Sequence, residues 1–300
     1  MIPGMRMVIA VGGNALRDTD EHGAAGSTLD ALAAVVAATA AEHAVVVTHG
    51  SGPQVGRFAD RAAGIPLDVL DAEVDGYLGY LLARAVGSAA PTRDVATLLT
   101  QVRVESDDPA FATPTKPVGP FVTAAQAAAD ARARGRTFAE VGPATEVARF
   151  RRVVASPRPC AIFEVHAIDA LLRAGVVVVA GGGGGIPVVV DPRGRRTGVE
   201  AVVDKDRTSA LLAIGLAADR LVILTDVDAV YADFGTDRAR PLGAVRARDL
   251  VPDDYPAGSM GPKVEAAAAF VTATDGTAAI GSVHEATGVI AGTSGTQVAP

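Results

Sequence analysis

Five short runs of apolar, mostly β-branched residues constrain the fold most strongly, because each run ends at glycine or polar residues. The runs span residues 6–11, 44–48, 175–180, 221–225 and 278–280. They are apolar throughout rather than alternating, which is typical of strands in a parallel sheet that is covered on both faces. Ala- and Leu-rich stretches at helical spacing lie between them, at 28–41, 73–86, 124–134, 164–174, 208–216 and 262–272. This alternation predicts a doubly wound α/β sandwich.

Charge, cysteine content and hydropathy argue against several classes of function. Lys and Arg number 27 against 34 Asp and Glu, and the net charge of −7 argues against a basic surface for nucleic acid. The single cysteine, Cys160, excludes an intrachain disulfide and a cysteine-based metal cluster. The apolar run at residues 8–11 is too short for a signal peptide, and no apolar stretch is long enough to span a membrane. We therefore expect a cytoplasmic protein with no nucleic-acid or membrane partner.

Residues 107–157 differ in composition from the rest of the chain. They are richer in Pro, Arg and Thr, and their prolines are Pro109, Pro114, Pro117, Pro120, Pro143 and Pro157. We expect a single domain over residues 1–300, within which 107–157 forms a small protruding subdomain or lid. A flexible surface insertion is the alternative.

Three glycine clusters follow predicted strands, at the carboxyl ends where ligands bind in open parallel sheets. The clusters are Gly12-Gly13-Asn14, Gly50-Ser51-Gly52 and the five glycines of residues 181–185. Glycine lets main-chain N–H groups approach an anion closely, because no side chain intervenes. A single glycine pair more often forms a tight turn, but three glycine clusters at equivalent strand ends favour phosphate binding. The sequence contains no Walker or dinucleotide-binding glycine motif. His49 is better explained as a hydrogen-bonded structural histidine, since no nucleophile pattern accompanies it.

The lysines are the most informative charged residues, because the chain has few of them and mostly uses Arg. Lys205 lies between Asp204 and Asp206 at the start of a predicted helix. Lys263 follows Pro262, which suits the first position of a helix, so its ammonium group opposes the helix dipole. An anionic ligand at that helix start would explain the lysine. A solvated surface lysine is the alternative.

Lys116 is flanked by prolines, which restrict the backbone and fix the direction of its side chain. A rigid turn with an incidental lysine fits equally well. A lysine cluster with Mg²⁺ is what phosphoryl transfer requires, because charge spreads over the transferring oxygens. Asp206 could orient the lysines or reach a metal through water, and Asp226 could serve a nucleotide. Both aspartates could instead be helix caps or turn formers.

Nine strings of residues, in order and over nearly the whole chain, form a recognisable series. They are VGGNAL (11–16), HGSGPQVG (49–56), KPVGP (116–120), RRVVASP (151–157), GGGGIPV (182–188), EAVVDKD (200–206), LTDVDAVY (224–231), GSMGPKVE (258–265) and GT (295–296). Any one string is weak, but together they are specific. The series resembles the carbamate kinases of the amino-acid-kinase family.

The resemblance implies a fold, a reaction and a set of partners. The fold is a three-layer αβα sandwich around a mainly parallel sheet, and the protein is a homodimer. The cofactors are ATP or ADP with Mg²⁺. The family's reaction interconverts carbamoyl phosphate plus ADP with carbamate plus ATP, in arginine catabolism.

The resemblance also implies a role for each residue at a matching position. Lys205 and Lys263 would stabilise the transferring phosphoryl group, with Asp206 organising them, and Lys116 would reach in from the subdomain. Phosphoryl oxygens and the acceptor would be held by Gly12, Gly13, Asn14, Gly50, Ser51, Gly52, Gly183 and Gly184. The nucleotide pocket would be lined by Asp226, Tyr231, Met260 and Gly261. No side chain is expected to ligate the metal directly.

Departures from the family's pattern fall on the acceptor side. Ser51 stands where the family usually has Asn, and serine lacks the two donors of an amide. Asp75 stands where the family usually has Gln, and a carboxylate near an anionic acceptor would repel it. The stretch after Leu16 is also shortened. Two alternatives to a carbamate kinase follow: a kinase of another small carboxylate-like acceptor, and a nucleotide-binding protein that lacks catalysis.

Overall fold

The computed structural model describes residues 4–13, 27–51, 54, 58, 64–141, 148–256 and 258–300. Its main feature is an eight-stranded sheet in which every neighbouring pair is parallel except β16 and β17. The predicted mainly parallel sheet is therefore confirmed. The order across the sheet is β15 (Ala244–Arg246), β17 (Thr296–Ala299), β16 (Thr277–Ser282), β12 (Arg220–Thr225), β1 (Arg6–Val11), β2 (Ala44–His49), β9 (Val177–Ala180) and β3 (Val95–Leu98).

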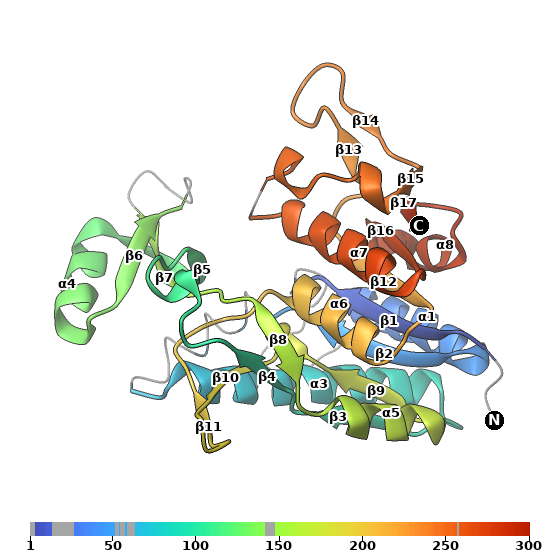
Figure 1. The fold of residues 1–300 in the computed structure, drawn as a ribbon, viewed down its shortest axis with the longest axis horizontal. Coiled ribbons are helices and arrows are strands. Elements are labelled where there is room, and N and C mark those ends of the chain that lie inside the picture. Colours follow the sequence, from blue (N-terminus) through green and yellow to red (C-terminus); the bar gives the residue numbers. More distant parts are fainter. Residues whose placement is uncertain are drawn as a thin grey trace.

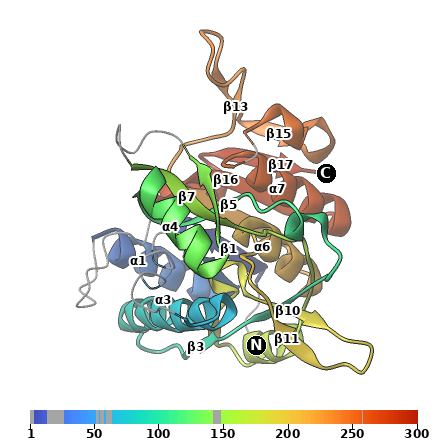
Figure 2. The same ribbon diagram turned by 90° about the vertical axis from the view of Figure 1, so that its left-hand side faces the viewer.

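Alternate residues of the central strands face two separate cores, which makes the fold a three-layer sandwich. In β1, Ile9 and Val11 pack with helices α1 (Ser27–Glu42), α3 (Leu67–Ala89) and α8 (Ala286–Ala291). Val8 and Ala10 pack on the opposite face with α5 (Val165–Arg173), α6 (Lys205–Gly215) and α7 (Gly261–Thr274). Figures 1 and 2 show helices on both sides of the sheet. The predicted αβα sandwich is confirmed.

The predicted elements differ from the observed ones mainly at their ends, and the differences have local causes. Helix α6 begins three residues before predicted position 208, because the side chain of Asp204 accepts hydrogen bonds from the first N–H groups and caps the helix. Helix α3 begins six residues early, because Leu67 and Leu70 are buried in the core. Strand β9 begins two residues late, because Gly175 has a φ of +85° just after α5.

A second, antiparallel sheet projects from the main body (Figure 1). Its order is β5 (Lys116–Thr123), β7 (Ala148–Val154) and β6 (Thr137–Glu140), and α4 (Ala124–Arg134) packs against it. Thr123 and Gln126 exchange side-chain to main-chain hydrogen bonds that fix the start of α4. All four elements come from the proline-rich segment 107–157.

Two smaller groups of strands complete the fold. One is a four-stranded sheet with the order β11 (Arg196–Gly198), β10 (Ile186–Val190), β4 (Gln101–Val104) and β8 (Pro159–Ile162). The other is the hairpin of β13 (Tyr231–Ala232) and β14 (Arg240–Pro241). Among the helices of the described residues, none is both long enough and apolar enough to cross a membrane.

Candidate active site

The chain contains three lysines and 24 arginines, and the structure brings the three lysines together. Lys116 is the first residue of β5, Lys205 is the first residue of α6, and Lys263 lies in the first turn of α7. All three line one cavity of about 180 Å³. An ammonium group is a compact, strongly hydrated charge that arginine does not replace at such sites. The restriction of lysine to one cavity therefore marks it as the candidate site.

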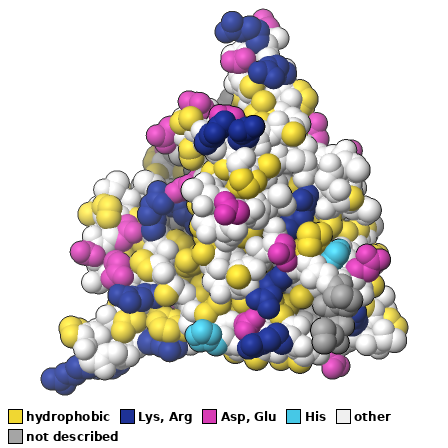
Figure 3. All heavy atoms as spheres, turned by 45° about the vertical axis from the view of Figure 1, so that its right-hand side comes forward, with side chains coloured by type: hydrophobic (Ala, Val, Ile, Leu, Met, Phe, Trp, Pro, Cys, Tyr) yellow, Lys and Arg dark blue, Asp and Glu magenta, His cyan; other side chains and the backbone are white. Residues whose placement is uncertain are grey.

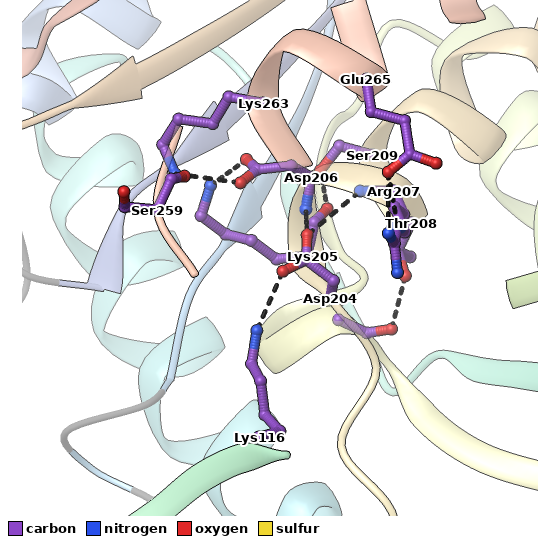
Figure 4. Close-up of polar contacts among 11 residues, drawn as sticks. Lys116, Asp204, Lys205, Asp206, Arg207, Thr208, Ser209, Ser259, Lys263 and Glu265 are labelled. Carbon is purple, nitrogen blue, oxygen red and sulfur yellow. Dashed lines mark hydrogen bonds and ion pairs between the residues drawn. The ribbon is translucent and has the colours of Figure 1, made fainter. Parts of the chain in front are cut away.

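Asp206 is the shared partner of two of these lysines. The Nζ atom of Lys263 lies 3.1 Å from Oδ2 of Asp206, and Nζ of Lys205 contacts Oδ1. The buried carboxylate lies at the N-terminus of α6, where the helix dipole stabilises negative charge. Figure 4 shows both ammonium groups turned toward it. Asp206 thus holds two positive charges close together at the cavity.

Lys116 contacts a different carboxylate. Its Nζ atom lies 2.9 Å from Oδ2 of Asp204, whose Oδ1 accepts the N–H of Asp206 at 3.0 Å (Figure 4). Burial alone would raise the pKa of Asp204, but the ammonium groups of Lys116 and Lys205 outweigh it and hold the pKa well below its usual range. An ionised Asp204 therefore ties the small sheet to the N-terminus of α6.

The first two glycine clusters lie side by side next to Lys205. A Cβ atom on Gly50 would lie 2.7 Å from the nitrogen of Gly13 and 3.3 Å from Cδ of Lys205, so only glycine permits this approach. The N–H groups of Gly12 and Gly50 donate to carbonyl groups of neighbouring strands, each at 2.9 Å, and are thus used in the main sheet. Two predicted residues of these clusters lie outside the described residues: Asn14 and Gly52.

The five glycines of residues 181–185, here called the glycine loop, contribute to the cavity wall through Gly183. Four of them have positive φ, between 65° and 99°: Gly181, Gly183, Gly184 and Gly185. A Cβ atom on Gly183 would overlap Oγ of Ser51, and one on Gly184 would overlap the carbonyl oxygen of Val203. Gly183 lines the cavity with Gly50 and Ser51, whereas Gly184 is buried behind it. Residues 182–185 leave no room for a Cβ atom, and at Gly181 the positive φ alone favours glycine.

Asp75, one of the two departures from the family's pattern, lies outside the cavity. It comes from the middle of α3, is 1% exposed, and is not among the residues that line the cavity. Its carboxylate lies behind the glycine loop, with Oδ1 3.5 Å from Nε2 of His49. The sequence leaves open whether this carboxylate faces the acceptor, and the structure places it on the far side of the loop, because α3 packs beneath the loop. Ser51, the other departure, does line the cavity.

His49 is fully buried at the end of β2, as expected of a structural residue. The expectation of a hydrogen-bonded histidine is wrong, because neither ring nitrogen makes a hydrogen bond to the described residues. Its polar neighbour is Asp75, at a distance just beyond that of a normal hydrogen bond.

A second cavity of about 230 Å³ adjoins the first, and Lys263 lines both. Three of the residues predicted to face a nucleotide line this second cavity: Asp226, Tyr231 and Met260. Gly261 is buried at the start of α7 and is not among the lining residues. The position of Lys263 means that one ammonium group can contact ligands in both cavities.

Two aromatic residues of the second cavity were missed by the sequence analysis. Phe234 and Tyr255 line it together with Tyr231, and the rings of Tyr231 and Phe234 meet edge to face with centroids 6.5 Å apart. Because aromatic residues make up only 4% of the chain, Phe234 three residues after Tyr231 is a signal that could have extended the predicted pocket, whereas Tyr255 joins it only by packing from a separate segment. An apolar pocket with aromatic walls suits a planar heterocycle.

Within the described ranges, no three His, Cys, Asp or Glu side chains are grouped so that they could hold a metal ion. Both oxygens of Asp206 are engaged by ammonium groups, and Asp204 is engaged by Lys116 and by the start of α6. The described carboxylates at the cavity therefore pair with the lysines and cap the start of α6.

Comparison with known proteins identifies the family. The model of the amino acid kinase family matches residues 5–282. The chain belongs to the amino acid kinase family. As a member of that family it is a phosphotransferase, and its curated relatives include the carbamate kinases of Rhizobium meliloti and Haemophilus influenzae. The first is 43% identical, with 97% of this chain and 92% of that protein covered. The second is 39% identical, with 98% and 96% covered.

Solved structures give the same grouping within the amino acid kinase family. The carbamate kinase from Giardia lamblia bound to AMP-PNP has a TM-score of 0.86 and 33% identity, and the match covers 100% of this chain and 99% of that one. The resemblance to carbamate kinases that the motifs indicate is confirmed over the whole length.

Proposed function

We propose that this amino acid kinase is a carbamate kinase, which transfers a phosphoryl group reversibly between ATP and carbamate. One observation carries the proposal: the chain's only lysines converge on the cavity next to an aromatic pocket, and Lys263 lines both. Curated relatives at 39–43% identity over nearly the full length are carbamate kinases. A nucleotide base fits the aromatic pocket, and its phosphates then extend toward the lysines.

The charges at the cavity suit a transferring phosphoryl group. Three ammonium groups face two carboxylates, Asp204 and Asp206, so the site carries a net positive charge. In the direction of ATP formation, a β-phosphate oxygen of ADP attacks phosphorus and the bond to the carbamate oxygen breaks. Lys205 and Lys263 stabilise the charge on the equatorial oxygens, and Asp206 fixes their positions before the reaction. Most of the catalysis is then positioning and electrostatics.

A magnesium ion is part of this proposal. The engaged carboxylates of the cavity fit an ion that is held mainly by phosphate oxygens and water, as Mg²⁺ usually is at nucleotide sites. The ion would neutralise phosphate charge. Lys205, Lys263 and Asp206 would orient the phosphoryl group beside it.

The proposal includes a single domain over residues 1–300 with a small subdomain at 107–157. Its own sheet and helix support this division, and two ion pairs join it to the main body. Lys116 of β5 contacts Asp204, and Arg152 of β7 contacts Glu200 with a 2.6 Å separation. Both carboxylates lie in the segment that leads into α6, so the subdomain would carry Lys116 to the reacting group as a lid.

We extend the proposal to the assembly and its surroundings. Tyr80 on α3, the helix that packs against edge strand β3, and Leu99 just after β3 are 59% and 50% exposed, which supports a homodimer through this edge of the main sheet. Figure 3 shows acidic and basic side chains interspersed on the face that it presents, which supports a small-molecule substrate and no nucleic-acid or membrane partner. A cytoplasmic location and a role in arginine catabolism complete the proposal.

The decisive experiment measures ATP formation from carbamoyl phosphate and ADP with Mg²⁺. We expect turnover by the native chain and a loss of at least about a hundredfold in Lys263→Ala. An exposed arginine substitution, Arg248→Ala, is the matched control and should leave the rate unchanged. Stabilisation by ADP without ATP formation would instead favour the alternatives, and a screen of small carboxylates as phosphoryl acceptors would separate another kinase from a nucleotide-binding protein.

A further inference from the structure

A buried pair of polar side chains supports the glycine loop from below. His49, at the end of β2, and Asp75, in the middle of α3, are here called the loop floor; they are 0% and 1% exposed. A Cβ atom on Gly182 would overlap the carboxylate of Asp75 and would lie 2.5 Å from Nε2 of His49. The main chain of Gly182 therefore rests directly on both side chains.

Asp75 reaches the loop by a second route, through Thr100. Its Oδ2 atom accepts the N–H of Thr100 at 3.4 Å. Thr100 in turn holds both ends of the loop, because its Oγ1 accepts the N–H of Gly181 at 2.8 Å and its carbonyl accepts the N–H of Ile186 at 2.8 Å. Moving Asp75 would thus disturb the loop at its centre and at both ends.

Stability does not explain the polarity of the loop floor. Oδ1 of Asp75 lies 3.5 Å from Nε2 of His49, but neither of these atoms, nor Nδ1 of His49, makes a hydrogen bond to the described residues, and all three are buried. A buried polar group without such a bond costs about 1–3 kcal/mol, and well-packed apolar side chains often replace buried ion pairs without loss. The arrangement therefore calls for an explanation in function.

The loop floor lies on the acceptor side of the site only. Gly183, the next residue after Gly182, lines the lysine cavity. It lies so close to Ser51 that a Cβ atom on Gly183 would overlap the Ser51 hydroxyl oxygen. The aromatic cavity contains no residue of the glycine loop or of its floor. A shift of the floor would therefore move the wall that meets the acceptor and leave the nucleotide pocket unchanged.

We propose that Asp75 is a positioning residue for the carbamate side of the site: through His49, Thr100 and the glycine loop, it sets the cavity wall that binds carbamate and, in the direction of ATP formation, carbamoyl phosphate. The inference rests on the proposed function. It assigns to Asp75 a supporting role that the carboxylate performs by its shape and its oxygen acceptor, without contact with the substrate.

The test compares Asp75→Ala with Asp75→Asn by steady-state kinetics. We expect Asp75→Ala to raise KM for carbamoyl phosphate about tenfold or more, because small misplacements of a binding wall are costly, while KM for ADP stays within about twofold. Asp75→Asn keeps the shape and an oxygen that accepts the N–H of Thr100, so it should restore KM for carbamoyl phosphate to near the native value.

Asp71→Asn is the matched control, because Asp71 is a buried carboxylate one turn earlier on α3 that does not contact the loop. It should leave both KM values unchanged. The inference would be overturned if Asp75→Ala raised both KM values equally or raised neither. It would also be overturned if Asp75→Asn did not restore KM for carbamoyl phosphate. If the native chain forms no ATP from carbamoyl phosphate, the proposed function fails separately. Asp75→Ala should then still lose thermal stabilisation by inorganic phosphate while keeping that by ADP, and retention of both shifts would overturn the inference.

Discussion

Two polar groups are associated with the same cavity: one lines it and the other lies behind its wall, and they are built in opposite ways. In the phosphoryl cluster of Lys205, Asp206 and Lys263, each charge has an oppositely charged partner and all three side chains reach the cavity. In the loop floor of His49 and Asp75, three polar atoms make no hydrogen bond to the described residues and neither side chain reaches the cavity. The first group acts on the ligand by charge, and the second acts by holding a wall in place.

The largest effect on catalysis is expected from a substitution in the phosphoryl cluster. Lys263→Ala removes an ammonium group from the point where both cavities meet, and kcat should fall by about a hundredfold or more. The fold should survive, because Lys205 still pairs with Asp206 and the core around α7 is apolar, and a melting curve of the variant checks this. Rates near those of the native chain would show that Lys263 does not stabilise the transferring group.

The next effect comes from crowding the loop floor. In Gly182→Ala the new methyl group would overlap Asp75 and press on His49, so the loop must shift. We expect KM for carbamoyl phosphate to rise about tenfold and the free energy of unfolding to fall by about 1–3 kcal/mol. Gly243→Ala is the control, since a Cβ atom there meets nothing within 4 Å. Native-like kinetics in Gly182→Ala would contradict the role of the loop as a fixed wall.

Lys116→Met breaks the contact between the small sheet and the phosphoryl cluster. The Lys116 ammonium group helps hold the pKa of Asp204 below its usual range, so the pair stabilises the folded state above the unfolded pKa of aspartate. We expect the variant to lose about 1–2 kcal/mol at pH 7. The difference from the native chain should shrink as the pH falls below about 4. Urea titrations at pH 7 and at about pH 2.5, inside the window between the unfolded and folded pKa values, measure it, and a pH-independent difference would contradict the ion pair.

The smallest effect concerns Asp71, whose pKa is raised well above its usual value by burial and by the carboxylates of Asp68, Asp75 and Glu200. A raised pKa means that the folded state binds its proton more tightly, so stability is lost as the pH rises above the unfolded value. Asp71→Asn removes this penalty and should raise Tm at pH 7 by about 2–4 °C for each kcal/mol gained. The gain should vanish near pH 4, and a lower Tm at pH 7 would contradict the assignment.

The contrast between the phosphoryl cluster and the loop floor also shows which parts of the site can be predicted from the sequence. Lys205, Asp206 and Lys263 are predictable because lysine is unusual at a helix start and each residue lies beside a local signal such as a proline or a second carboxylate. The strands are predictable for the same reason, since an apolar run such as β1 carries its own boundaries in the residues that follow it.

The loop floor is not predictable in this way, because His49 and Asp75 are distant in the chain and meet only when α3 packs under the glycine loop. Sequence comparison notices Asp75 as a departure, but it cannot show on which side of the loop the carboxylate lies. The aromatic pocket depends likewise on the packing of Phe234 and Tyr255 from separate segments.

The three lysines of this chain allow one direct measurement of the central claim, that all three ammonium groups surround one transferring group. An amine-selective acylating reagent, followed by peptide mass spectrometry, reports the labelling rate at Lys116, Lys205 and Lys263 separately. With ADP, Mg²⁺ and carbamoyl phosphate at saturation, the three rates should fall together. An unchanged labelling rate at any of them, and at Lys263 above all, would contradict the account.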